Sequence, residues 1–445
     1  MRLWIKNPLA ILADGAQGGL VVEEGRIVEL VPGGSTPRAD ETFDASAHVV
    51  LPGLVNTHHH MFQTLTRAHP SAINKELFPW LKALYPIWAA NMNPDAFRLA
   101  TRLALVELLM SGCTTVSDHQ YLFPVGLDDA MDIQAEEAER VGLRMTLTRG
   151  SMSLSQKDGG LPPDTIVQDD EAILADCERV IAKYHDLSDG SMLRVALAPC
   201  APFTVTKNLM RETAAMAERH DCTCHTHLGE TLDENDYCLE HYGCRPLDYI
   251  EDLGWLTPRT WLAHGIHFET EEVERIGRHG VGVCHCPTSN MVLASGHCRT
   301  KELEAAGAPV GLGVDGSASN DNSNLIEGVR HALMINRLTY DAASVTHGDA
   351  LRWATEGSAR CLRRDDIGVI APGKQADMAM FTLDELRFSG AGDPLAALVL
   401  CGAHRADRVM VKGEWRVVDG EPVGIDVARL RHEHGKAART FAQTL

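Results

Sequence analysis

The sequence predicts an α/β fold, a (β/α)8 TIM barrel with a small β-sandwich built from both chain ends beside it. Residues 51–365 alternate strand-like apolar runs with helical stretches, a pattern typical of parallel strands joined by crossover helices. Residues 1–50 and 366–425 read instead as short strands separated by turns. Histidine and aspartate side chains also stand at the ends of several central strands, as functional residues do in a barrel.

The two chain ends carry the signals of short antiparallel strands. Residues 27–31 and 409–413 are strand-like apolar runs, and Glu23-Glu24-Gly25 and Val418-Asp419-Gly420 are turn signals. We therefore expect 1–50 and 366–425 to pair as one domain flanking a barrel over 51–365. The tail, residues 426–445, is expected to form a surface helix.

The central region supplies clear strands and helices in alternation. Its predicted strands are 49–55, 194–198, 222–227, 261–263, 282–286 and 310–314. Its predicted helices are 95–111, 128–141, 170–186 and 207–220. A barrel of about 250 residues forms a single domain, so the length of this region fits one catalytic domain.

Composition restricts the class of protein. The chain has 445 residues, 44% of them hydrophobic, and a net charge of −20, which argues against nucleic acid or an anionic membrane as a partner. Lys6 and Asp14 interrupt any secretory signal, and no apolar run reaches the about 18 residues that a membrane span needs. The twelve cysteines fit reduced thiols in a long chain. We expect a cytoplasmic homo-oligomer.

Five side chains with metal-ligand chemistry stand at the ends of four separate predicted strands. They are His58, His60, His227, His264 and Asp315. Strand side chains alternate faces, so His58 and His60 point the same way and His59 the other. Neutral imidazole nitrogens and a carboxylate suit zinc, with iron(II) as the second candidate. The ordered set predicts one divalent ion at the mouth of a barrel.

Three further patterns offer alternative readings. His225 points the same way as His227 and competes with it as a ligand, but His227 stands at the strand's end and has Glu230 three residues later. His267 and Glu269 mimic the His-x-Glu of the zinc-dependent nucleobase deaminases, a class that the lack of a following Pro-Cys-x-x-Cys excludes. The pair Cys284 and Cys286 fits core packing better than a soft-metal site.

Several motifs together resemble the amidohydrolase superfamily, in its cytosine deaminase and chlorohydrolase-like branch. They are Leu-Pro-Gly-Leu-Val-Asn-Thr-His-His-His at 51–60, Gly-Cys-Thr-Thr-Val-Ser-Asp at 112–118, His-Leu-Gly-Glu at 227–230, Cys-Pro-Thr-Ser-Asn at 286–290, Gly-Val-Asp-Gly-Ser-Ala-Ser-Asn at 313–320 and Ala-Pro-Gly-Lys-Gln-Ala-Asp at 371–377. The resemblance implies that the metal ligands are His58, His60, His227 and Asp315. It implies that Glu230, His264 and Asp315 are catalytic.

The same resemblance implies a single metal ion, because binuclear relatives place a bridging lysine on strand four and the run 193–199 has none. Asp315 would take a proton from the attacking water, and His264 would orient the attacking oxygen. Glu230 would protonate a ring nitrogen and carry a proton to departing ammonia.

Five side chains are candidates for contacts to a small heterocyclic substrate. Gln63 resembles the position where relatives place an amide against the ring, and Trp80 could stack on it or belong to the core. His119 and Tyr121 follow a predicted strand and could face the mouth. Arg149 ends another strand, where it could meet a carbonyl-rich ring edge or instead pair with a carboxylate of the barrel.

Two segments, 117–124 and 148–164, look like one subgroup, the 8-oxoguanine deaminases. That resemblance implies the hydrolysis of 8-oxoguanine to urate and ammonia. Hydroxytriazine (alkyl)aminohydrolases or chlorohydrolases and pterin deaminases share much of the pattern and stay open as alternatives. A non-catalytic barrel that only binds a ligand is disfavoured, because both Asp315 and Glu230 are present.

Overall fold

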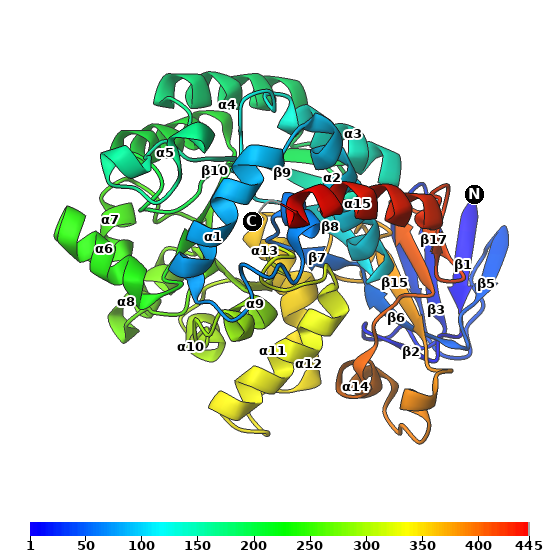
Figure 1. Cartoon of the computed structure of the whole chain (residues 1–445). Coiled ribbons are helices and arrows are strands. Elements are labelled where there is room, and N and C mark those ends of the chain that lie inside the picture. The colour runs from blue at the N-terminus through cyan, green and yellow to red at the C-terminus, as the bar shows by residue number, and fades with distance from the viewer. Residues whose placement is uncertain (444–445) are drawn as a thin grey trace.

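Eight parallel strands form the centre of the molecule and close into a barrel (Figure 1). The computed structural model describes residues 1–443. The barrel strands are β7 (Leu54–Asn56), β8 (Cys113–Ser117), β9 (Arg144–Ser151), β10 (Leu193–Pro199), β11 (Thr223–Leu228), β12 (Thr260–His264), β13 (Gly282–His285) and β14 (Val310–Leu312). They neighbour one another in sequence order, and the Thr57 backbone N–H donates to the Leu312 carbonyl to join the last strand to the first. The predicted fold class is confirmed.

Helices cover the outside of the barrel, as crossover connections require. They are α1 (Leu77–Asn91), α2 (Pro94–Met110), α3 (Ala130–Val141), α4 (Asp170–Tyr184), α5 (Lys207–His220), α6 (Leu232–Tyr242), α7 (Pro246–Glu251), α8 (Thr270–Arg278), α9 (Pro287–Val292), α10 (Thr300–Ala305), α11 (Leu325–Thr339), α12 (His347–Arg352) and α13 (Ser358–Cys361). Short helical turns η1 (Met61–Thr66), η2 (Gln156–Asp158), η3 (Asp164–Ile166) and η4 (Trp353–Gly357) lie between them.

Local sequence explains where these elements begin and end. The Asn93 side chain accepts the Ala96 N–H at the start of α2, and Pro94 occupies the first helical position, where its missing N–H costs nothing. The Thr206 hydroxyl caps α5 in the same way. All five residues of β8 are buried, as expected of a strand covered on both faces.

Two smaller sheets stand beside the barrel (Figure 1); the first contains N-terminal strands only, and the second combines strands from both ends of the chain. One has the order β4 (Arg26–Val31), β3 (Gly19–Glu23), β1 (Arg2–Lys6), β5 (Glu41–Asp44). The other has the order β18 (Glu421–Pro422), β17 (Glu414–Val418), β16 (Arg408–Val411), β15 (Met378–Thr382), β6 (His48–Pro52), β2 (Ala10–Ile11). Ile5 and Leu20 of the first sheet share a buried core with Val50 and Met378 of the second.

The predicted C-terminal helix is α15 (Val427–Ala442); the last two residues of the predicted segment, 444 and 445, lie outside the described residues. This helix packs on α2 and η1 rather than standing free, with Leu430 and Phe441 buried. His434 Nε2 lies 3.1 Å from the Thr64 hydroxyl of η1. Two further short helices, α14 (Pro394–Ala397) and η6 (Leu398–Gly402), and the turn η5 (Leu386–Phe388) lie between β15 and β16.

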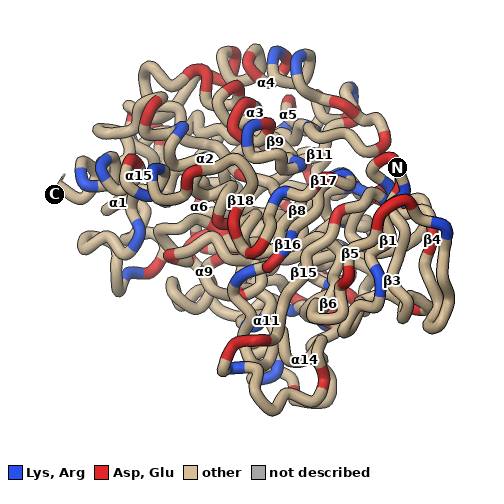
Figure 2. Tube along the Cα trace, turned by 90° about the vertical axis from the view of Figure 1, so that its right-hand side faces the viewer, with Lys and Arg blue, Asp and Glu red and all other residues tan. Residues whose placement is uncertain are grey.

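Charged residues of both signs are interspersed along the trace (Figure 2). Arg408 pairs with Asp419 at 2.7 Å, and Arg405 pairs with Glu421 at 2.7 Å, so basic side chains of this face have acidic neighbours. Across residues 1–443, no helix combines the length and apolar character needed to cross a membrane. All twelve cysteines are free.

Candidate metal centre and active site

A buried cavity opens inside the carboxyl end of the barrel, where active sites of this fold lie. Its empty space, with the solvent at its mouth included, amounts to about 420 Å³. The lining residues come from most of the barrel loops and from α1: His60, Gln63, Leu77, Trp80, Leu81, Tyr85, Tyr121, Cys200, Ala201, Phe203, His227, Glu230, His264, Leu293, Asp315 and Ser319. The cavity therefore combines aromatic walls with one polar end.

Three histidines at the polar end have their Nδ1 atoms occupied by hydrogen bonds. His60 Nδ1 lies 3.0 Å from the His119 carbonyl oxygen, and His227 Nδ1 lies 2.6 Å from the Cys200 carbonyl oxygen. Because a carbonyl only accepts, both Nδ1 atoms carry the proton and both Nε2 atoms are left with a lone pair. His58 Nδ1 is bound by His225 at 2.7 Å.

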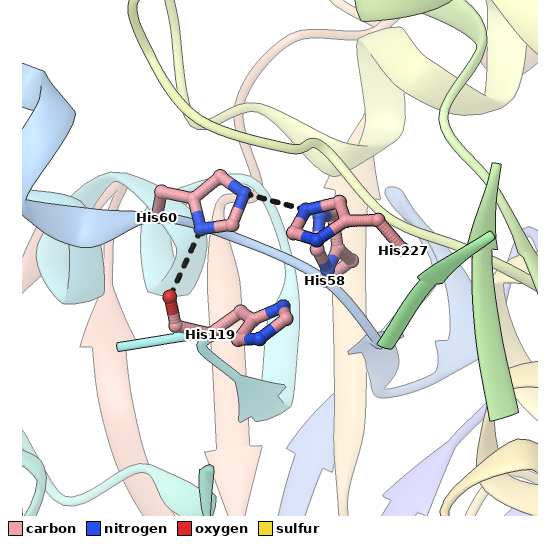
Figure 3. Close-up of side chains that lie close together, drawn as sticks. All are labelled: His58, His60, His119 and His227. Carbon is pink, nitrogen blue, oxygen red and sulfur yellow. Dashed lines mark hydrogen bonds between the residues drawn. The ribbon is translucent and has the colours of Figure 1, made fainter. Parts of the chain in front are cut away.

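The free Nε2 atoms of the three histidines lie close together (Figure 3), and one carboxylate oxygen lies beside them. His60 Nε2 and His227 Nε2 are 3.1 Å apart, and Asp315 Oδ1 lies 3.3 Å from Nε2 of both His58 and His60. With bonds of about 2.0–2.1 Å, a tetrahedral zinc site places two ligand atoms about 3.3 Å apart. His58 Nε2 is buried and has no hydrogen-bond partner among the described residues. The donor set therefore fits a divalent ion.

The ionisation of these groups suits a cation. Burial lowers the pKa of His58 well below its usual value, so the ring is neutral. Burial alone would raise the pKa of Asp315, but the neighbouring rings of His58, His264 and His60 hold that pKa well below the ordinary range. Neutral imidazoles and an ionised carboxylate are the protonation states that bind a metal.

Two residues of the site have an unusual backbone conformation. His264 and Asp315 both adopt positive φ, 72° and 65°, which costs energy for residues other than glycine and is found at functional sites. Asp315 stands three residues beyond the end of β14. A Cβ on Gly316 would lie 1.9 Å from Gln63 Oε1, so glycine at this position makes room for the Gln63 side chain.

Glu230 and His264 face the converging donor atoms from the next strands. His264 Nε2 lies 3.4 Å from Glu230 Oε2 and 4.0 Å from Asp315 Oδ2. Burial raises the pKa of Glu230 to about 7. The Asn290 side chain holds His264 Nδ1 at 3.0 Å, which gives a physical reason for the last residue of the Cys-Pro-Thr-Ser-Asn motif.

Three of the predicted substrate contacts, Gln63, Trp80 and Tyr121, line the cavity. Gln63 Oε1 accepts the Ala318 N–H at 3.3 Å, and the Trp80 indole N–H donates to the Ala318 carbonyl at 3.1 Å. Through these two hydrogen bonds, Ala318 connects η1 and α1 to the loop that carries Asp315.

The other two predicted contacts, His119 and Arg149, are absent from the described lining of the cavity. The His119 ring stacks on His227 at a centroid distance of 4.6 Å, and its Nε2 lies 2.9 Å from the Ala198 carbonyl. Arg149 Nε pairs with Asp176 of α4 at 2.8 Å, and its guanidinium lies 3.9 Å from the centre of the Phe123 ring. Arg149 therefore has the carboxylate partner that the sequence left open as its alternative.

Sequence reasoning missed several residues of the cavity. Tyr85, Leu77 and Leu81 come from α1, and Phe203 and Cys200 from the loop after β10. Helical spacing of 77, 81 and 85 was the available signal, since it places these three side chains on one face. Ser319 could have been noticed within the Gly-Val-Asp-Gly-Ser-Ala-Ser-Asn motif; its hydroxyl lies 3.4 Å from Asp315 Oδ2.

The barrel, the converging histidines and the buried carboxylates define a metal-dependent hydrolase. The model of the amidohydrolase family matches residues 49–416, and the chain belongs to that family.

Relatives of this chain are known in sequence and in structure. It is 62% identical to 8-oxoguanine deaminase of Pseudomonas aeruginosa over 98% of both chains. It is 36% identical to isoxanthopterin deaminase from an unknown prokaryotic organism, over 92% of this chain and 89% of the relative. The zinc complex of atrazine chlorohydrolase from Arthrobacter aurescens TC1 superposes with a TM-score of 0.92 at 30% identity, covering 98% of this chain and 100% of the other.

Proposed function

We propose that this enzyme hydrolyses 8-oxoguanine to urate and ammonia. The observation that carries the proposal is the 62% identity to 8-oxoguanine deaminase across 98% of both chains. The pterin deaminase shares 36% and the triazine chlorohydrolase 30%, so both alternatives are supported less. The cavity, with aromatic walls and few polar groups, suits a flat heterocycle.

One divalent ion, with zinc first and iron(II) second, is the proposed cofactor. Its proposed ligands are His58, His60, His227 and Asp315, supported by their converging donor atoms and by the zinc-bound relative. When bound, such an ion lowers the pKa of a water molecule toward about 7 and makes it a nucleophile.

Asp315 is proposed to deprotonate that water, and His264 is proposed to orient it. Asp315 Oδ1 faces the histidine ligands, whereas Oδ2 faces His264, so Oδ2 is free to accept a proton from the attacking water. His264 Nε2 lies between the carboxylates of Asp315 and Glu230, where it can orient the attacking oxygen.

Glu230 is proposed as the acid that serves the ring. With a pKa raised to about 7 by burial, it can hold a proton near neutral pH and give it to the ring nitrogen beside the carbon under attack. The water oxygen forms a bond to that carbon, and the bond from carbon to the exocyclic nitrogen breaks. One proton of the water, accepted by Asp315, passes to the leaving nitrogen through Glu230, and ammonia departs. The other proton of the water leaves the new oxygen as the carbonyl forms and replaces the proton that Glu230 gave to the ring nitrogen.

Gln63 is proposed to recognise a carbonyl on the substrate ring. Its Oε1 is occupied by the Ala318 N–H, so its Nε2 remains to donate a hydrogen bond. Trp80, Tyr85 and Tyr121 supply apolar walls on which a ring can pack. A donor of this kind favours purines that carry carbonyl groups over those that lack them.

We further propose a cytoplasmic homo-oligomer. Helices α9 and α11 contact each other and expose Met291, Val292 and Leu338, the last with 82% of its surface accessible. Exposed apolar side chains on two helices that contact each other are a feature of contact surfaces. Light scattering of the purified protein, compared with Leu338→Glu, tests the oligomer.

A steady-state screen tests the proposed reaction. Purified, zinc-loaded enzyme is offered 8-oxoguanine, guanine, isoxanthopterin and a hydroxylated aminotriazine, and ammonia release is measured for each. We expect the highest kcat/KM with 8-oxoguanine and urate as its product. A preference for the pterin or the triazine would assign the enzyme to that alternative.

A further inference from the structure

His225 is a fully buried histidine of β11 that neither lines the cavity nor belongs to the proposed ligand set. Both of its ring nitrogens are engaged. Nδ1 lies 2.8 Å from the Trp261 carbonyl oxygen, and Nε2 lies 2.7 Å from His58 Nδ1. His225 therefore stands directly behind one of the converging histidines, on the side away from the cavity.

The Trp261 carbonyl oxygen determines which atom donates in each of these hydrogen bonds. A carbonyl oxygen accepts only, so His225 Nδ1 carries its proton and its Nε2 offers a lone pair. His58 Nδ1 must then donate to that lone pair, which leaves His58 Nε2 unprotonated at the convergence point. If His58 carried its proton on Nε2 instead, that proton would block its bond to a cation.

Trp261 fixes the ring of His225 in this role. The two rings stack at a centroid distance of 4.3 Å with an interplanar angle of 11°. The Trp261 indole N–H donates to the Thr57 carbonyl at 3.1 Å, immediately before His58. One tryptophan thus holds both partners of the hydrogen bond between His225 and His58.

Among the three histidines, His58 alone has no backbone carbonyl as an Nδ1 partner in the described structure. His60 and His227 donate to backbone carbonyls, which no substitution of a side chain removes. We propose that His225 is a positioning residue that fixes the tautomer of His58 and so sets the affinity of the site for a divalent cation. This inference rests on the proposed ligand set and not on the identity of the substrate.

The test compares the zinc affinity of two variants with that of the wild type. His225→Leu removes the acceptor, whereas the Oε1 atom of His225→Gln can still accept from His58 Nδ1. The matched control is His285→Leu on β13, since His285 is equally buried and neither of its ring nitrogens has a partner among the described residues. Zinc dissociation constants are measured by competition with a chromogenic chelator, and Tm is measured on the metal-free proteins.

We expect His225→Leu to weaken zinc binding by about 10- to 100-fold, the usual effect of losing a partner of a metal ligand. His225→Gln should recover most of that loss, and His285→Leu should bind zinc as the wild type does. Equal losses in His225→Leu and His225→Gln, or no loss in either, would overturn the proposal. A changed kcat/KM with any one substrate does not bear on it, which separates this test from that of the proposed reaction.

A measurement on the unmutated enzyme covers the case in which His225→Leu does not fold. Nitrogen-15 NMR of the zinc-loaded protein with labelled histidine reports which ring nitrogen of each histidine carries a proton. We expect protonated Nδ1 in both His58 and His225. A proton on Nε2 of His225 would contradict the proposal.

Discussion

His60 Nε2 and His227 Nε2 lie 3.1 Å apart, although 167 residues separate them in the sequence. Each presents a lone pair, because its Nδ1 proton is held by a backbone carbonyl. Two unprotonated nitrogens so close together in a buried site gain nothing from each other, so a cation between them accounts for the arrangement. The barrel thus assembles, from strands far apart in the chain, a site whose donor atoms fit a metal ion.

Glu230→Gln should lower kcat by at least about 10²-fold while leaving zinc content unchanged, because the amide keeps the shape but cannot carry a proton. Rapid-quench or steady-state assays with metal analysis of the same sample check this. Glu240→Gln on α6, an exposed position, is the control for the loss of one carboxylate. A kcat near that of the wild type would remove Glu230 from the reaction.

Gln63→Leu should reduce kcat/KM for 8-oxoguanine by about 10-fold, the worth of one hydrogen bond to a ring carbonyl. The substitution also leaves the Ala318 N–H without its acceptor, so Tm should be recorded alongside activity. The ratio of kcat/KM between 8-oxoguanine and a purine with fewer carbonyls is the informative quantity. If that ratio does not change, Gln63 does not contribute to the recognition of the ring carbonyl.

Arg149→Ala should destabilise the protein by about 1–3 kcal/mol, because it removes a buried guanidinium that pairs with the partly exposed Asp176 and packs on Phe123. Substrate preference should change little, since the guanidinium lies outside the cavity lining. Thermal unfolding and kcat/KM on two purines, measured on one preparation, separate the two effects. A stable variant with altered preference would restore Arg149 as a substrate contact.

Asp118 should make stability depend on pH. Burial raises its pKa to about 7, above its value in the unfolded chain of about 4. Its contribution is therefore fully present below about pH 4 and is lost as pH rises through 7. Asp118→Asn should flatten the fall in Tm between pH 5 and pH 8, and Gln134 can rotate its amide to accept from the new side chain, since its Oε1 has no partner among the described residues.

The control is Asp128→Asn, an exposed residue of the same loop. It removes one charge without removing a buried carboxyl. Parallel pH curves for the wild type and Asp118→Asn would show that another group is responsible.

Sequence patterns predicted the barrel because strand and helix periodicity is local, and they predicted the convergence of His58, His60, His227 and Asp315 because parallel strands end at one edge. The orientation of Arg149 could not be obtained in this way. A position at the end of a strand does not say whether a side chain faces the cavity or the helices outside, and Arg149 turns toward α4. Tyr85 and Phe203 were missed because the path of α1 and of the loop after β10 depends on tertiary packing.

The order of strands in the flanking sheets could not be predicted from the sequence either. β6 pairs with β15 over residues 48–52 and 378–382, and this register depends on contacts between segments more than 300 residues apart. Local propensity predicts that such segments form strands and leaves their partners open.

Zinc titration of the chelator-treated enzyme, with urate formation from 8-oxoguanine measured at each addition, tests the central claim most directly. We predict that activity rises in proportion to added zinc and reaches its plateau at one equivalent per chain. A plateau only at two equivalents would contradict the single-ion site, and an enzyme that forms no urate at any zinc content would contradict the proposed reaction.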